Sequence, residues 1–274
     1  MRPATPTGPL HRVAGTAHAR LSLALVVALI ALAWMALAGW SASPWRRWLD
    51  HGSWADLAWL GALCRAVPAG ERIVPALAYM LAWLLMIAAM MLPTVLPLLA
   101  IVRRIVDGRR DAGALVAAVA AGYALAWLAF GAVAYGIDSA VREAAAASGW
   151  LIAHGWVVGS VVIAGAGAFQ FSALKYRCLE RCRSPYGFVT SHWRGRRPLV
   201  ESLRLGFDHG LFCVGCCWAL MLVTFVVGMG SLGWMLALAA AMAAEKNLPW
   251  GSHLRGPLGV ALLAWGAGIA VANG

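Results

Sequence analysis

Long apolar segments recur along the whole chain, and they restrict its fold more than any other feature of the sequence. A helix needs about 20 largely apolar residues to cross the hydrocarbon core of a bilayer. We count seven segments that approach this length, or six crossings if the fifth segment and the short sixth form one kinked hairpin. The segments are residues 21–42, 75–101, 112–137, 150–174, 208–228, 231–244 and 256–272.

The composition excludes an ordinary soluble domain. Hydrophobic residues make up 62% of the 274 residues and charged residues 12%, whereas about a quarter of the residues in a soluble domain are charged. No segment alternates regularly between polar and apolar residues, as the strands of a transmembrane barrel do. We therefore expect an all-α fold, a polytopic membrane helical bundle with six or seven transmembrane helices.

Basic residues are unevenly distributed among the predicted loops. Loops that face the cytoplasm are usually enriched in lysine and arginine. Two loops hold most of these residues here, namely Arg103, Arg104, Arg109 and Arg110 in one and Lys175, Arg177, Arg181, Arg183, Arg194, Arg196, Arg197 and Arg204 in the other. This bias predicts a cytoplasmic N-terminus and, with seven spans, an external C-terminus. No nucleic-acid motif accompanies the basic loops, so we interpret the net charge of +11 as a signal for topology and for the lipid bilayer as partner, not nucleic acid.

The first apolar segment could belong to a cleaved signal peptide, because basic residues precede it. We favour an uncleaved anchor, since the apolar run that begins at Leu21 is longer than the usual core of a signal peptide. The loop that follows, residues 43–74, combines tryptophans with charged residues. This composition predicts an amphipathic helix that lies on the outer surface.

Five of the six cysteines fall in two tight clusters at opposite ends of one basic loop. The clusters are Cys178 with Cys182, and Cys213 with Cys216 and Cys217. Residues three or four positions apart share a face of a helix, so each cluster can present its thiols together. The predicted topology places both clusters at the cytoplasmic face, where thiols stay reduced. Thiolates are soft ligands that select Cu(I) or Zn(II), and the pattern therefore predicts a metal site. Packing of cysteine as a small buried residue is the alternative.

Three further residues extend the candidate ligand set. His209 lies one helical turn before Cys213, and Met90 and Met91 approach the cytoplasmic end of the second segment, just before Pro93. Thiolate and thioether ligands together favour Cu(I), so we expect Cu(I) and keep Zn(II) as the alternative. Methionine is also an ordinary packing residue, which leaves the role of Met90 and Met91 open.

Several motifs occur together in this order along the chain. They are Met90-Met91-Leu92-Pro93, Cys178-x-x-x-Cys182-Arg183-Ser184-Pro185, Gly210-x-x-Cys213-x-Gly215-Cys216-Cys217-Trp218 and Glu245-Lys246. The combination resembles an uncharacterised bacterial family of predicted metal-binding integral membrane proteins, a domain of unknown function of which some members are labelled copper chaperone. The resemblance implies metal binding by these cysteines in the bacterial inner (cytoplasmic) membrane. It also implies two regions: residues 1–74, the tail, first span and external loop, and residues 75–272, the metal-binding integral membrane domain.

The functional expectation is a non-enzymatic membrane protein. We expect it to bind a soft metal ion, Cu(I) before Zn(II), through its cytoplasmic cysteines for metal handover, assembly or transport, with a metal-donor or metal-acceptor protein as partner. Two other classes stay open: a membrane thiol-disulfide oxidoreductase and a transporter of another small solute. No quinone or substrate motif supports the first, and no inverted repeat supports the second.

Overall fold

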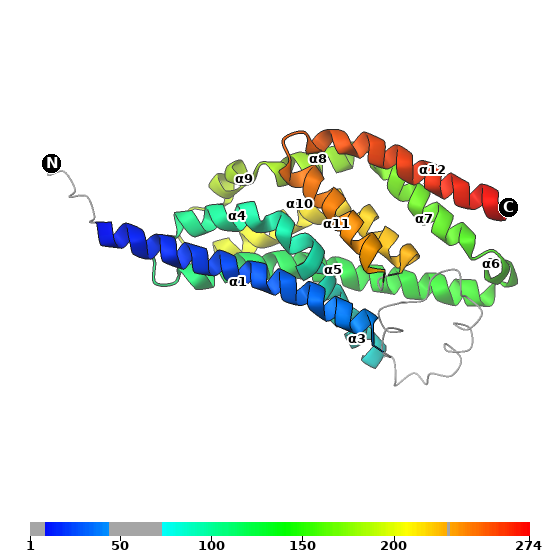
Figure 1. Cartoon of the computed structure of the whole chain (residues 1–274), viewed down its shortest axis with the longest axis horizontal. Coiled ribbons are helices and arrows are strands. Elements are labelled where there is room, and N and C mark those ends of the chain that lie inside the picture. The colour runs from blue at the N-terminus through cyan, green and yellow to red at the C-terminus, as the bar shows by residue number, and fades with distance from the viewer. Residues whose placement is uncertain (1–8, 44–72, 229–230) are drawn as a thin grey trace.

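The computed structural model describes residues 9–43, 73–228 and 231–274 (Figure 1). These residues form helices and no strands. The helices are α1 (Pro9–Ser41), α3 (Ile73–Met86), the π-helix η3 (Ile87–Met91), α4 (Leu92–Ile105), α5 (Ala112–Ala147), α6 (Gly149–Ala153), α7 (Trp156–Phe169), α8 (Ala173–Arg183), α9 (Pro185–His192), α10 (Pro198–Val227), α11 (Leu232–Asn247), the 3-10 helix η4 (Gly251–Leu254) and α12 (Arg255–Asn273). Most of the predicted external amphipathic loop, including Cys64, lies outside the described residues.

The fold class predicted from the sequence, an all-α membrane bundle, is confirmed. Within the described residues, five helices are long and apolar enough to cross a membrane, or up to six if α7 and α8, bent by 63° at their break, form one span. The segment 231–244 instead becomes α11, which has 16 residues. A helix of that length spans about 24 Å, less than the roughly 30 Å of a hydrocarbon core. Among the described residues the count is therefore five or six, not seven.

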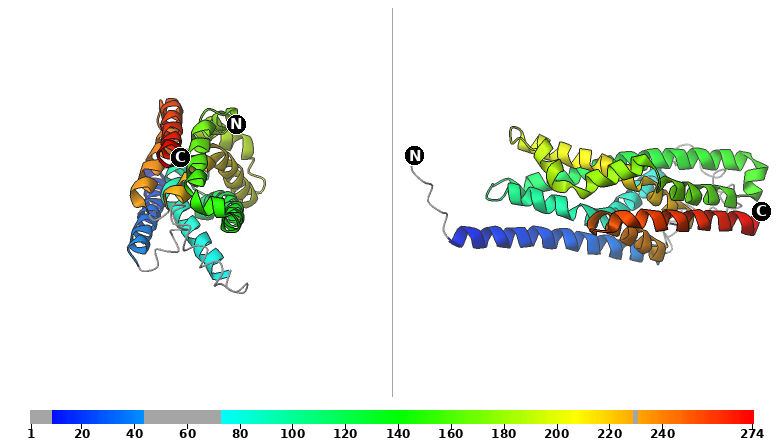
Figure 2. Two further views of the ribbon diagram at one scale, coloured as in Figure 1. Left: turned by 90° about the vertical axis from the view of Figure 1, so that its right-hand side faces the viewer. Right: turned by 90° about the horizontal axis from the view of Figure 1, so that it is seen from above.

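The helices run roughly along one axis of an elongated molecule (Figures 1 and 2). The described part of α1 begins at one end of this axis, and α12 finishes at the other. Helix α10 occupies the centre and contacts α5, α7, α8, α9 and α11. Large apolar side chains such as Leu25, Leu77, Val161 and Val260 face outward, as expected for helices surrounded by lipid. The helix that carries three cysteines is thus in contact with five other helices.

Glycines bring α5 and α10 into backbone contact. A Cβ atom on Gly206 would collide with the carbonyl oxygen of Val119, and one on Gly122 would collide with that of Leu203. Membrane helices use small residues in this way because close packing is what holds them together in lipid. The close approach fixes the position of α10, and with it the cysteines about two to three turns beyond Gly206.

The Gly206→Ala variant should therefore be less stable, because the added methyl meets backbone that cannot rotate away. We expect a loss of about 1–3 kcal/mol, the usual range for overpacking, measured as the free energy of unfolding in detergent. Gly136→Ala on α5 is the matched control, since a Cβ there meets nothing within 4 Å. Equal stability of the two variants would show that the α5–α10 contact is looser than described.

A π-helical turn interrupts the second segment where the prolines begin. Pro93 has no N–H to donate to the carbonyl of Ala89, four residues earlier, and that carbonyl instead accepts a hydrogen bond from the indole Nε1 of Trp34 at 3.1 Å. A neighbouring helix thus satisfies a backbone carbonyl that the proline leaves without its usual donor. Turns of this kind are frequent at functional sites, and this one carries Met90 and Met91.

Candidate metal centre

Helix α8 presents the first cysteine pair. It begins after Ser172, whose Oγ accepts a hydrogen bond from the Lys175 backbone N–H at 3.1 Å, and it ends before Pro185, which starts α9. A helix through Cys178 and Cys182 agrees with their spacing of four residues, and Pro185 disfavours a helical conformation of the residue before it. The sharp bend between α7 and α8 was not predicted, and it lays α8 against α10, so that Cys182 reaches the second cluster.

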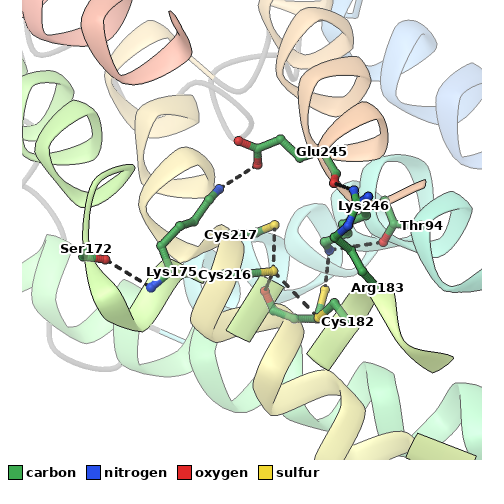
Figure 3. Close-up of polar contacts among 10 residues, drawn as sticks. Thr94, Ser172, Lys175, Cys182, Arg183, Cys216, Cys217, Glu245 and Lys246 are labelled. Carbon is green, nitrogen blue, oxygen red and sulfur yellow. Dashed lines mark hydrogen bonds and ion pairs between the residues drawn. The ribbon is translucent and has the colours of Figure 1, made fainter. Parts of the chain in front are cut away.

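Four cysteines from α8 and α10 form a compact group, which we call the thiol cluster: Cys182, Cys213, Cys216 and Cys217. Cys216 is central, with its Sγ 3.8 Å from the Sγ of Cys182 and 3.4 Å from that of Cys217 (Figure 3). Its thiol also donates to the Cys213 carbonyl at 3.2 Å. The Cys213 thiol interacts with the other three. The cysteine spacing on α10 and the bend before α8 together produce this group.

One of the two sulfur separations equals that of ligands that share one ion, and the other, 3.4 Å between Cys216 and Cys217, is shorter. Two sulfurs each about 2.3 Å from one tetrahedral ion lie about 3.8 Å apart, close to the Cys182–Cys216 separation. Among the described residues, no group of three or more His, Cys, Asp or Glu side chains has the arrangement of a preformed metal site. The structure therefore shows thiols in contact, and among the described residues it shows no complete coordination sphere.

Three other predicted ligands, Cys178, Met90 and Met91, are buried. Cys178 is buried against Gly215, where a Cβ would come within 2.6 Å of its Sγ, and no contact with the other thiols is recorded for it in the described structure. Met90 and Met91 are buried in η3, and the Met91 carbonyl accepts from the Thr94 hydroxyl at 2.7 Å and the Tyr123 hydroxyl at 3.4 Å.

His209 is the predicted ligand that faces an opening. Its side chain is 4% exposed, and its Nδ1 atom has no hydrogen-bond partner among the described residues. It lines a polar pocket of about 140 Å³ that also reaches the thiol cluster. The lining residues are Thr94, Pro97, Leu98, Cys182, Arg183, Pro185, His209, Lys246 and Asn247. Cys182 is half-buried, whereas the three cysteines of α10 are buried, so the pocket exposes the cluster at Cys182.

Lys246 lies inside the cluster, although the sequence did not single it out as part of the site. Its Nζ donates to the Cys213 Sγ at 2.8 Å and to the Thr94 Oγ1 at 3.3 Å (Figure 3). The Tyr123 hydroxyl lies 2.9 Å from the same sulfur. The Cys213 sulfur is therefore contacted from α5 and α11, and α4 contacts Lys246 through Thr94.

Glu245 pairs with Lys175 of α8 and not with Lys246, its neighbour in the sequence. Its Oε2 lies 2.6 Å from the Lys175 Nζ of α8, and both side chains are fully buried. Arg183 adds hydrogen bonds to the carbonyls of Glu245 and, at 2.9 Å, Pro249. These contacts join the two ends of α8 to the end of α11. Successive residues on a helix point in different directions, so Glu245 meets α8 while Lys246 meets the thiols.

The position of Lys246 at the end of an apolar helix was the sequence signal that could have revealed its place in the site. Ionisable residues within membrane segments usually face the interior of the bundle and mark functional sites. Lys175 and Lys246 both follow this rule, because each is buried and hydrogen-bonded. From the sequence, Lys175 was assigned only to topology and Lys246 only to a motif, so neither was predicted as part of the site.

Comparison with known proteins supplies the family. No curated protein and no solved structure matches the chain. A family model described as PpoB2, copper chaperone, matches residues 80–269, which covers every helix from α3 to α12 that contributes to the site. The predicted resemblance to metal-binding membrane proteins labelled copper chaperone is thereby confirmed. This multi-pass helical membrane chain belongs to the PpoB2 copper chaperone family.

Proposed function

We propose that the protein binds Cu(I) as cargo at the thiol cluster and hands it to an acceptor protein, without catalysing a reaction. The observation that carries the proposal is the position of Cys216, whose buried sulfur lies within 3.8 Å of two other thiols. Thiolates select Cu(I) among the available soft ions, and membership of a copper chaperone family supports the same ion.

Handover follows from the shape of the site. A donor can approach through the polar pocket and meets Cys182 first, because the three cysteines of α10 lie deeper. Each new bond from Cu(I) to a protein sulfur replaces one bond to a donor thiolate, and the proton of the protein thiol passes to the released donor thiolate. The oxidation state of copper does not change. The transfer is reversible, so an acceptor with stronger ligands can take the ion by the same route.

The proposed location is the bacterial inner membrane, with the pocket facing the cytoplasm. The arginines near the pocket and in the loop before α10 support this orientation through the positive-inside rule. The reducing cytoplasm would keep the thiol cluster able to bind metal.

The first test is the metal content of the full chain, purified anaerobically in detergent and loaded with Cu(I) or Zn(II). We expect about one copper per chain, and X-ray absorption should show a first shell of sulfur at roughly the 2.3 Å typical of metal–thiolate bonds. Preferential retention of zinc in a closed site with four ligands would contradict the proposal. Failure to retain either metal, with reversible formation of a Cys182–Cys216 disulfide, would favour thiol redox chemistry instead.

A further inference from the structure

The polar pocket beside the thiol cluster contains a permanent cation and no carboxylate. Its lining includes the Arg183 guanidinium, and none of the lining residues, all of which the structure describes, is Asp or Glu. A guanidinium stays charged in proteins, so this charge does not depend on the state of the neighbouring thiols. The carboxylate of Glu245, whose carbonyl accepts from Arg183, points to Lys175 instead (Figure 3). The charge in the pocket is therefore open to a small anion.

The hydrogen bonds of Arg183 leave part of its guanidinium group available to a ligand. It donates to the carbonyls of Glu245 and, at 2.9 Å, Pro249, and it forms no ion pair with a carboxylate among the described residues. A guanidinium has five N–H groups, and carbonyl dipoles offset only part of its charge. Carboxylates match its planar fork best. The pocket therefore favours a carboxylate over a neutral group of the same size.

Cys182 adds a sulfur to the same pocket. It is the half-buried cysteine of the thiol cluster, and its Sγ lies 3.8 Å from that of Cys216. Cys182 and Arg183 are adjacent residues of α8, and both line the pocket. A molecule in the pocket thus meets a soft metal ligand and a positive charge together.

The size of the pocket limits what it can hold. Its volume is about 140 Å³. A cavity of about 150 Å³ accommodates benzene. A short thiol with a carboxylate, such as 3-mercaptopropionate, has the same number of non-hydrogen atoms as benzene. The pocket therefore fits a thiol carboxylate with a chain of two or three carbons.

We propose that the polar pocket binds a small thiol carboxylate, and that Cu(I) reaches the thiol cluster as its complex with such a thiol. This inference rests on the proposed function and names the chemical class of the copper donor. Arg183 holds the carboxylate while the sulfur that carries copper meets Cys182. A bond from Cu(I) to the Cys182 sulfur forms as one bond from Cu(I) to the small thiol breaks. The proton of the Cys182 thiol passes to the released thiolate, and Cys216 then displaces a second small thiol in the same way. Copper remains Cu(I) throughout.

The test compares two copper donors that differ in charge and not in size. 3-Mercaptopropionate carries the carboxylate, and 3-mercaptopropionamide is its neutral counterpart. The Cu(I) complex of each is mixed with the reduced full-length protein in detergent, and rapid desalting at set times followed by elemental analysis gives the transfer rate. We expect transfer from the carboxylate donor to be at least about tenfold faster, which is about 1.4 kcal/mol.

Substitutions on α8 identify the residue responsible for this preference. Arg183→Gln should abolish it, and Arg183→Lys, which keeps the charge but loses the fork, should retain part of it. Arg177→Gln is the matched control, because Arg177 is an exposed arginine of the same helix that does not line the pocket. This control should keep the full preference.

Butyrate tests the pocket in the natural protein, because it has the carboxylate and lacks the thiol. It should slow transfer from the 3-mercaptopropionate donor, and butyramide should not. This arm decides the question even if the Arg183 variants do not elute as single species.

Equal rates from the two donors would overturn the inference, as would a preference that butyrate leaves unchanged. A preference lost in Arg177→Gln as fully as in Arg183→Gln would also overturn it, because it would show long-range attraction by the basic loop. The proposed function fails separately. If replacement of the α10 cysteines leaves Cu(I) binding intact, the cargo site is elsewhere, whatever the donor comparison shows.

Discussion

Replacing Cys213, Cys216 and Cys217 together with serine should abolish copper binding. Serine hydroxyls are hard, neutral ligands that do not hold Cu(I), and the change removes three of the four sulfurs in the thiol cluster. We expect the copper content to fall from about one ion per chain to less than about a tenth of that, measured by elemental analysis after anaerobic loading.

Cys178→Ser provides the matched control for this experiment. Cys178 is buried like the α10 cysteines, but its recorded neighbour is Gly215 and not another thiol. The variant should keep copper near the level of the natural protein. Stoichiometric copper in the triple variant would refute the cluster as the binding site, and loss of copper in Cys178→Ser would extend the site along α8.

Replacing Lys175 with methionine should destabilise the protein severely. The substitution leaves the Glu245 carboxylate fully buried without its cation, and breaking a buried ion pair in this way usually lowers the free energy of unfolding by about 3–5 kcal/mol. Helix α11 should then separate from α8. The measurement is chemical unfolding of the purified protein in detergent, with intrinsic tryptophan fluorescence as the signal.

The double variant Lys175→Met with Glu245→Leu tests the reason for this loss. Both charges are then absent, so most of the stability should return, because a well-packed apolar pair often replaces a buried ion pair without penalty. If the double variant is as unstable as Lys175→Met alone, the loss comes from packing around α8 and not from the unpaired carboxylate.

Much of the candidate site was visible in the sequence. The spacing of Cys213, Cys216 and Cys217 required a helix that presents neighbouring thiols, and Pro185 fixed where the helix with Cys182 must end. The residues chosen as ligands, including His209, Met90 and Met91, were candidates by chemical type. Their actual coordination of a metal remains a prediction.

Other parts of the site depend on contacts between distant helices. The bend between α7 and α8 arises at residues with no proline, and packing of α8 on α10 decides which of its cysteines reaches the cluster. Lys246 meets Cys213 from 33 positions away along the chain. A one-dimensional pattern cannot show such a meeting, since it gives the face on which a residue lies but not the helix that covers that face.

The sequence by itself determined that this chain is a helical membrane protein with two sets of thiols near one face, because hydrophobic length and helical spacing are local properties. The tertiary structure decided the rest: that α11 is a short helix and not a full span, that Cys182 joins the α10 cysteines while Cys178 packs against Gly215, and that a buried lysine accompanies the sulfurs. These outcomes depend on close packing of glycine-lined helices and on balancing buried charges. Both require every partner to be in place at once.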